Sequence, residues 1–258
     1  MRFLADQPPV TFPTIDLGCG NWCSLNYTTL ITSAIALLIV ILIAVLLVTH
    51  LAPGRPGRFQ AIFEWLYGYV RDQVHDLVAE DAAFVVPLAG TLGIFILVSN
   101  WLEAFPLDAV GLRAPTADLN LTLALTLLVI LMVQGYSIKV QGFRGYLHRF
   151  TKPFDGPIPL RAAFTPLNII EEAQKILTLS FRLFGNLLAG AMMIWLLGYL
   201  LGNAPIWLGG PFIIAPVATT LWKLFDVFFI GTIQAYIFML LTIVYFGQAR
   251  EGMAGEHH

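Results

Sequence analysis

The stretch Leu179-Ser-Phe-Arg-Leu-Phe-Gly-Asn186 places a charged side chain, Arg182, inside a largely apolar run over residues 164–201. A charge near the centre of a bilayer costs about 2.5–3.5 kcal/mol on insertion scales. A chain that keeps a charge at such a place usually uses it on the path of an ion or a substrate. Arg182 is therefore the first candidate functional residue.

The composition of the whole chain indicates a membrane protein. Of the 258 residues, 58% are hydrophobic and only 12% are charged, whereas soluble proteins carry about 25% charged residues. Several apolar runs approach the 20 residues that a spanning helix needs. The net charge of −2 argues against a nucleic-acid partner. Cys19 and Cys23 could form a small disulfide or be incidental thiols, and we assign them no chemistry.

Apolar periodicity predicts an all-α integral membrane protein with five membrane-inserted helices plus one interfacial amphipathic helix. Residues 59–78 have helical apolar spacing but carry several charges, so this helix is too polar to span. A polar, proline-containing loop is expected over residues 141–161. The predicted ranges are a leader outside the membrane (1–28) and a single membrane domain (29–258), with spans at 29–49, 83–105 and 119–140, the interfacial helix at 58–79, and two long helices at 166–201 and 211–247.

The last two predicted helices are longer than a bilayer is thick. Thr165-Pro166 suits the start of the first one, since proline is tolerated in a first turn. A helix of about 35 residues is about 50 Å long, and the hydrocarbon core is about 30 Å thick. We therefore predict a long, strongly tilted hairpin.

Basic residues in short loops predict the orientation. They gather in the regions 48–82 and 139–161, whereas 106–118 holds only Arg113 and 202–210 holds none. Because basic loops stay in the cytoplasm, the N-terminus is expected outside and the C-terminus in the cytoplasm.

A polar stripe accompanies Arg182 along its helix. Glu171, Lys175, Thr178, Arg182 and Asn186 follow one another at intervals of 4, 3, 4 and 4 residues, which puts them on one face. Hydrogen bonds between helices could explain the two neutral side chains, and snorkelling could explain Glu171 and Lys175. Neither explanation suits Arg182, which lies deep in the helix.

A second polar group is expected toward the outer side. It contains Asn100, Glu103, Asp226 and, near the level of Arg182, Gln234. An interfacial cap at the first two residues and a structural pair between Lys223 and Asp226 are the simpler alternatives. Taken together, the two groups suggest two offset half-channels for protons, with the cation of Arg182 between them.

Four motifs in the order of the chain resemble subunit a of the F-type ATP synthase. They are Asn100-Trp-Leu-Glu103, Ala117-Asp-Leu-Asn-Leu-Thr122, Ser180-Phe-Arg-Leu-Phe-Gly-Asn-Leu-Leu-Ala-Gly190 and Ile233-Gln-Ala-Tyr-Ile-Phe-Met-Leu-Leu-Thr242. The resemblance implies a non-catalytic, ion-conducting stator subunit of a bacterial inner (plasma) membrane. Its implied partners are the c-subunit ring, the b-subunit peripheral stalk and the remaining ATP synthase subunits. No cofactor or metal is implied.

The resemblance also implies roles for the polar residues. Arg182 matches the arginine that faces the ring carboxylates and blocks a direct leak of protons. The outer half-channel would contain Asn100, Glu103, Asn186, Asp226 and Gln234, and the inner one Glu171, Lys175 and Thr178. Direct nucleotide binding is not expected, because the chain has no phosphate-binding loop of the glycine-rich type.

The sequence departs from the family pattern in two places. Relatives often carry Glu or His nine residues after the arginine, where this chain has Ala191, and a relay group seven residues before the glutamine, where it has Val227. Asp226 lies one position earlier. Seven residues return a helix to within about 20° of its start, and eight leave it about 80° away. We therefore predict a π-bulge near Gly231 that returns Asp226 to the channel face.

Two other classes of protein remain as alternatives at this point. A secondary transporter could bind an anionic substrate at Arg182, although such folds usually show repeats and paired broken helices, which this sequence lacks. A membrane scaffold would use its polar residues only to join helices. The coupling ion and the stoichiometry of the ring are left open by the sequence.

Overall fold

The computed structural model describes residues 14–16, 24–49, 57–78, 82–105, 112, 114–151, 158–203 and 210–251. Cys19 and Cys23 lie outside these residues, and so does most of the predicted leader. Two short strands, β1 (Thr14–Asp16) and β2 (Ser24–Asn26), pair antiparallel just before the first helix. The rest of the described chain is almost entirely helical.

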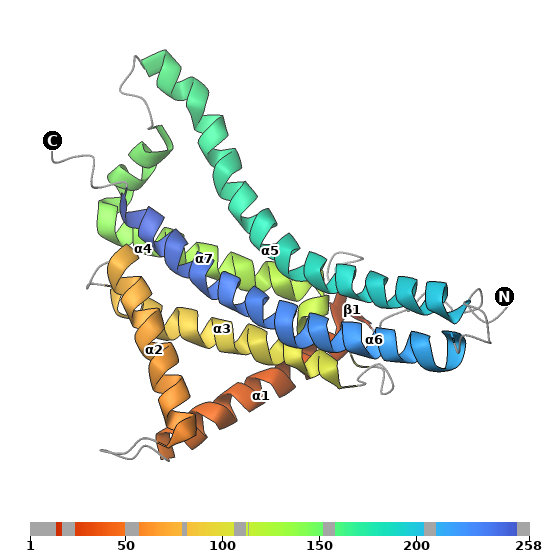
Figure 1. Cartoon of the computed structure of the whole chain (residues 1–258). Helices are drawn as coiled ribbons and strands as arrows, with labels where there is room; N and C mark the ends of the chain where they lie inside the picture. Colours follow the sequence, from red (N-terminus) through yellow and green to blue (C-terminus); the bar gives the residue numbers. More distant parts are fainter. Residues whose placement is uncertain are drawn as a thin grey trace.

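The helices follow one another as Figure 1 shows. They are α1 (Tyr27–Thr49), α2 (Arg58–Leu77), α3 (Val85–Trp101), α4 (Leu119–Thr151), α5 (Ile158–Gly202), α6 (Ala215–Leu224) and α7 (Gly231–Glu251). Short 3-10 turns occur at Leu102–Ala104 (η3) and Pro115–Ala117 (η5). Two π-helical stretches, Gly210–Ile214 (η7) and Phe225–Ile230 (η8), precede and follow α6, so that η7 to α7 form one continuous helical path.

Five helices are long and apolar enough to cross a membrane. They cover Tyr27–Thr49, Val85–Ala104, Leu119–Phe143, Ile169–Gly202 and Phe212–Ala249. Helix α2 is not among them, in agreement with its amphipathic sequence. The predicted fold class, with five spanning helices and a sixth polar-faced one, is therefore confirmed, and the protein is a multi-pass membrane protein.

The segment between the third span and the long hairpin differs from the expected loop over residues 141–161. Helical structure continues from α4 to Thr151, beyond a break at Gly142, whose φ of 71° is readily adopted only by glycine. Helix α5 begins at Ile158 rather than 166, so Pro166 lies inside it. A proline there removes one backbone donor, and the helix runs through it nevertheless.

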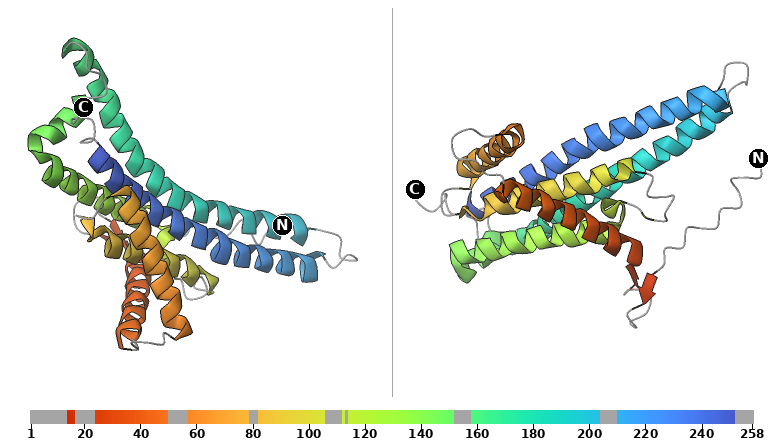
Figure 2. Two further views of the ribbon diagram at one scale, coloured as in Figure 1. Left: turned by 60° about the vertical axis from the view of Figure 1, so that its left-hand side comes forward. Right: turned by 90° about the horizontal axis from the view of Figure 1, so that it is seen from below.

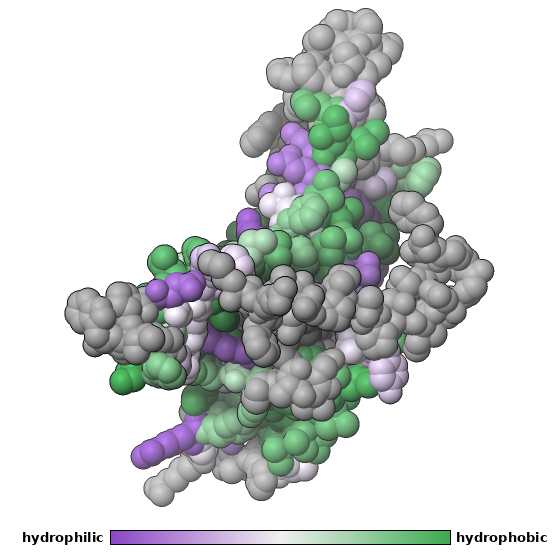
Figure 3. All heavy atoms as spheres, turned by 90° about the vertical axis from the view of Figure 1, so that its right-hand side faces the viewer, coloured by the Kyte–Doolittle hydropathy of each residue, from purple (hydrophilic) through white to green (hydrophobic). Residues whose placement is uncertain are grey.

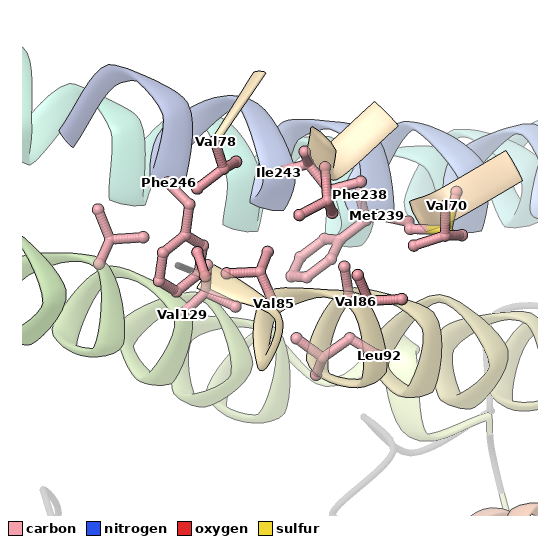
Figure 4. Packing of buried hydrophobic residues seen from close by; sticks show 14 of the residues in the cluster. Val70, Val78, Val85, Val86, Leu92, Val129, Phe238, Met239, Ile243 and Phe246 are labelled. Atoms are coloured by element: carbon pink, nitrogen blue, oxygen red, sulfur yellow. The ribbon is translucent and has the colours of Figure 1, made fainter. Parts of the chain in front are cut away.

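The core lies where α2, α3, α4 and α7 meet. Figure 4 shows Val78, Val85, Phe238 and Phe246 pointing toward one another. Leu179 and Leu183 of α5 belong to the same buried cluster. Gly93 of α3 lets α7 come close, because a Cβ on it would lie 3.2 Å from the Cβ of Met239. This packing fixes α7, and with it the η8 segment that precedes it.

Helix α5 and the η7–α7 path form the predicted hairpin. Figures 1 and 2 show α5 beside α6 at the Gly202 end and diverging from α7 toward Ile158. Its tilt in a bilayer stays a prediction. Apolar side chains make up much of the coloured surface in Figure 3, with polar patches between them, as suits a chain surrounded by lipid and membrane partners.

Candidate functional site

Gly190 of α5 and Asp226 of η8 bring the two arms of the hairpin close together. A Cβ built on Gly190 would overlap the Asp226 carboxylate. Arg182 lies eight residues before Gly190, and Gln234 lies eight residues after Asp226. Because the two helices run in opposite directions, going back eight residues along α5 and going forward eight residues along the other helix are both displacements of about 12 Å in the same direction. Arg182 and Gln234 therefore lie at about the same level, as an antiparallel hairpin predicts.

Asp226 is buried at the start of a π-helical segment. It exposes only 5% of its surface, and its carbonyl accepts the backbone N–H of Gly231, five residues later. A π turn takes up one extra residue. The eight residues from Asp226 to Gln234 thus keep nearly the phase that seven residues have in a regular helix, and Gln234 is buried too. The predicted π-bulge is confirmed.

The simpler explanation of Asp226 as half of a structural ion pair is not supported. Within the described part of the chain, Lys223 makes no ion pair with Asp226. Lys223 is half-buried in the last turn of α6. The Asp226 carboxylate instead packs against Gly190 of α5.

Asn100 and Trp101, at the end of α3, contact the residues that follow Asp226. Asn100 donates from Nδ2 to the carbonyl of Gly231 at 3.0 Å, and its Oδ1 accepts the Thr116 hydroxyl at 2.8 Å. Trp101 donates from Nε1 to the Thr232 hydroxyl at 3.2 Å. Asn100 is buried and joins three segments, so it bridges helices and does not form the interfacial cap that was the simpler alternative for it.

Two other predicted outer residues lie in η3 and α5. Glu103 is half-buried in η3, and Asn186 is half-buried one turn after Arg182. Helix α3 contacts both η5 and η8, and η5 contacts α5. The structure thus joins Asn100 and Asp226 of the predicted outer group through Gly231, and the place of Glu103 and Asn186 beside them stays a prediction.

Arg182 lies on a face of α5 that the described part of the chain leaves exposed. Leu179 and Leu183 turn into the core and are almost completely buried. Arg182, Thr178 and Glu171 are exposed. Large apolar side chains flank them on the same helix, among them Leu177, Phe181, Leu188, Met192 and Trp195. A charged stripe bordered by exposed apolar residues indicates a surface that another membrane component covers.

Lys175 belongs to a cluster that links α4, α5 and α7. Its Nζ lies 2.9 Å from Oε1 of Glu172, and Gln134 of α4 donates to Oε2 of Glu172 at 3.0 Å. The same Nζ lies 5.8 Å from the ring centroid of Tyr245 in α7. Lys175 is thus half-buried and paired with Glu172, whereas Glu171 is exposed.

Sequence reasoning missed Glu172, Gln134 and Tyr245. The three-residue spacing from Glu172 to Lys175 is a known signal for an ion pair on a helix, and it could have favoured Glu172 over Glu171. Nothing in the sequence alone connects α4 or α7 to this pair. Among the described residues, no group of three His, Cys, Asp or Glu side chains could hold a metal ion.

The arrangement combines a buried carboxylate, a cation on an uncovered face and a second group of ionisable side chains beyond the cation. Along α5, the buried carboxylate of Asp226 lies on one side of the level of Arg182, and the group around Lys175 lies on the other. Such a series suits the transfer of a charged particle between two sides of a membrane better than the binding of a large substrate.

Comparison with known proteins shows the family to which the chain is similar. The family described as "ATP synthase A chain" matches residues 30–247. A protein of Acidothermus cellulolyticus named "ATP synthase subunit a" is 36% identical over 98% of this chain and 91% of its own length. A protein of Mycobacterium bovis and one of Mycobacterium tuberculosis, with the same name, are each 39% identical over 91% of both chains.

The fold and the matched length define a membrane subunit of a larger complex. The chain belongs to the ATP synthase subunit a family. The resemblance found in the four motifs is confirmed, and so is the interpretation of the chain as a subunit rather than an enzyme complete in itself. The transporter and scaffold alternatives receive no support from these relatives.

Proposed function

We propose that this chain is the proton-translocating stator subunit of a rotary F-type ATP synthase. It would offer two offset half-channels to carboxyl groups on a ring of c subunits. Arg182 would stand between the half-channels, attract each deprotonated ring carboxylate and block direct leakage. Its guanidinium keeps its charge in every protein environment, which a barrier of this kind requires.

One observation carries the proposal: Arg182 is exposed on an apolar face of α5 at a level between buried Asp226 and the Lys175 cluster. An unpaired charge on a lipid-facing surface is costly. A partner that supplies a carboxylate would offset that cost, and the c ring is such a partner. The peripheral b subunit and the remaining ATP synthase subunits would complete the complex.

Protons would enter from outside through the group formed by Asn100, Glu103, Asn186, Asp226 and Gln234. Of these five residues, only Asp226 and Glu103 can bind and release a proton. The family's relay position is Val227 here, which has no such group, so Asp226 beside it would act as the relay. The amide of Gln234, at the level of Arg182, can orient the guanidinium without neutralising it.

On the other side of Arg182, protons would leave along Glu171, Lys175 and Thr178. We propose that this side is cytoplasmic, since the basic segments flank it. The N-terminus would then lie outside a bacterial plasma membrane and the C-terminus inside. Residues 1–28 would form the outer leader, and residues 29–258 a single membrane domain.

Substitution of Arg182 tests the proposal against the transporter and scaffold alternatives. In membrane vesicles that contain the complete complex, Arg182→Ala is expected to abolish ATP-driven proton pumping while the amount of assembled complex stays unchanged. Arg182→Lys should retain little pumping, because burial can depress the pKa of a lysine. Pumping at the original rate in Arg182→Ala would contradict the barrier role, and loss of assembly alone would favour a scaffold.

A further inference from the structure

Two consecutive side chains at the end of α3 hold the π-helical segment. Asn100 donates to the Gly231 carbonyl, and Trp101 donates to the hydroxyl of Thr232. That hydroxyl in turn donates to the carbonyl of Phe228, inside η8, at 2.5 Å. The Trp101 ring also packs edge-on against the ring of Phe228, with centroids 5.4 Å apart.

These contacts meet a need that a π turn creates. The turn shifts backbone hydrogen bonds from the fourth to the fifth residue, so groups beside it lose their regular partners. A backbone carbonyl within a membrane must find a donor inside the protein. Thr232 and Asn100 supply donors next to the turn. Gly231 also leaves room for Asn100, since a Cβ there would lie 3.1 Å from the Asn100 Cβ.

We propose that Asn100, Trp101 and Thr232 form a clamp that holds the π turn and so keeps the Asp226 carboxylate against Gly190. They are positioning residues, which act through Asp226. The inference rests on the proposed relay role of Asp226. Without the clamp, the segment relaxes toward a regular helix, and the Asp226 side chain rotates away from the face that it shares with Gln234.

The charged side chains on the elements next to Asp226 are few. Among the described residues, those closest along the chain to its contacts are Glu103 in η3, Arg182 in α5 and Lys223 in α6, whereas Glu171, Glu172 and Lys175 lie farther along α5. None of these residues belongs to the clamp. A change in the proton affinity of Asp226 caused by a clamp variant would therefore come from a change in its position.

The test compares variants that remove one hydrogen bond each in the assembled ATP synthase. Thr232→Val removes the hydroxyl and keeps the shape, Thr232→Ser restores the hydroxyl, and Trp101→Phe removes the ring N–H. Thr219→Val is the matched control, because Thr219 donates to the Ala215 carbonyl at 2.8 Å within regular α6. Asp226→Asn tests the relay role itself.

The measurement is the pH dependence of proton flow through the complex, with pH varied on the side of Asn100. Thr232→Val and Trp101→Phe are expected to shift the midpoint by roughly half a pH unit or more and to slow flow about fivefold. Thr232→Ser should restore the original midpoint. Added to Asp226→Asn, Thr232→Val should cause no further loss, since both act on one group.

The outcomes separate the two claims. If Asp226→Asn stops the flow but Thr232→Val behaves like Thr219→Val, the relay role stands and the clamp is wrong. A clamp variant that only lowers the amount of complex, with an unchanged midpoint, also overturns the clamp. If Asp226→Asn leaves flow intact, the relay role is wrong and the clamp has nothing to position.

Discussion

Gly190 of α5 lies directly against the carboxylate of Asp226, so that any larger residue at position 190 would overlap it. The contact joins the two arms of the hairpin on the side of Arg182 that we assign to proton entry. It also fixes the register that brings Arg182 and Gln234 to one level. A glycine is thus required here by space rather than by backbone conformation.

Replacement of this glycine should displace the relay carboxylate. Gly190→Ala is expected to lower proton pumping about tenfold, because overpacking costs about 1–3 kcal/mol. Gly198 lies in the same helix, and a Cβ built on it would have nothing within 4 Å. Gly198→Ala should therefore leave pumping unchanged. If both variants pump equally well, the contact with Asp226 is unimportant.

The two adjacent glutamates of α5 should behave differently. Glu172→Gln weakens the links to Lys175 and Gln134, so the free energy of unfolding should fall by about 1 kcal/mol. Glu171→Gln, on the exposed face, should change stability by less than about 0.5 kcal/mol and act mainly on proton flow. Thermal unfolding of the purified subunit or complex measures both. Equal losses of stability would contradict the geometry.

The π turn predicts an unusual tolerance to deletion. Removal of Phe229, whose side chain is exposed, leaves seven residues from Asp226 to Gln234. A regular helix aligns these within about 20°, so the variant should keep proton pumping within about threefold of the original. Deletion of Ile243, which is fully buried in α7, should abolish assembly. Complete loss of pumping in the assembled Phe229 deletion would contradict the role of the π turn.

Helix α2 depends on a close backbone contact with α7. A Cβ on Gly247 would lie 2.8 Å from the Leu77 carbonyl oxygen. Gly247→Ala should therefore lower the free energy of unfolding by about 1–3 kcal/mol, whereas Gly90→Ala, with open space around it, should not. Hydrogen exchange of the last turn of α2 should rise only in the first variant. Unchanged exchange there would show that α2 is held by other contacts.

Much of the fold could be predicted from the sequence because apolar length and periodicity depend on short-range pattern. The spans and the amphipathic α2 follow from these patterns alone. Pro166 misled the prediction of where α5 begins, since proline ends many helices but a long one can continue through it. The helix beyond Gly142 was also missed, because its polar residues resemble a loop.

The site was predictable where a spacing within one helix carried the information. The interval of eight residues from Asp226 to Gln234, compared with the seven of the family pattern, predicted the π turn, and the intervals around Arg182 predicted a stripe. Contacts between helices were less accessible. The pairing of Glu172 with Gln134, and of Trp101 with Thr232, depends on which faces meet in the bundle. No pattern along the chain specifies that.

The most direct test of the account is a density map of the assembled complex at the level of Arg182. The account predicts the guanidinium within a few ångströms of a carboxyl group on the c ring, about 3–4 Å in the closest ring position, with Asp226 still packed on Gly190. An Arg182 side chain that faces only lipid or bulk water, with no acidic ring beside it, would contradict the central claim.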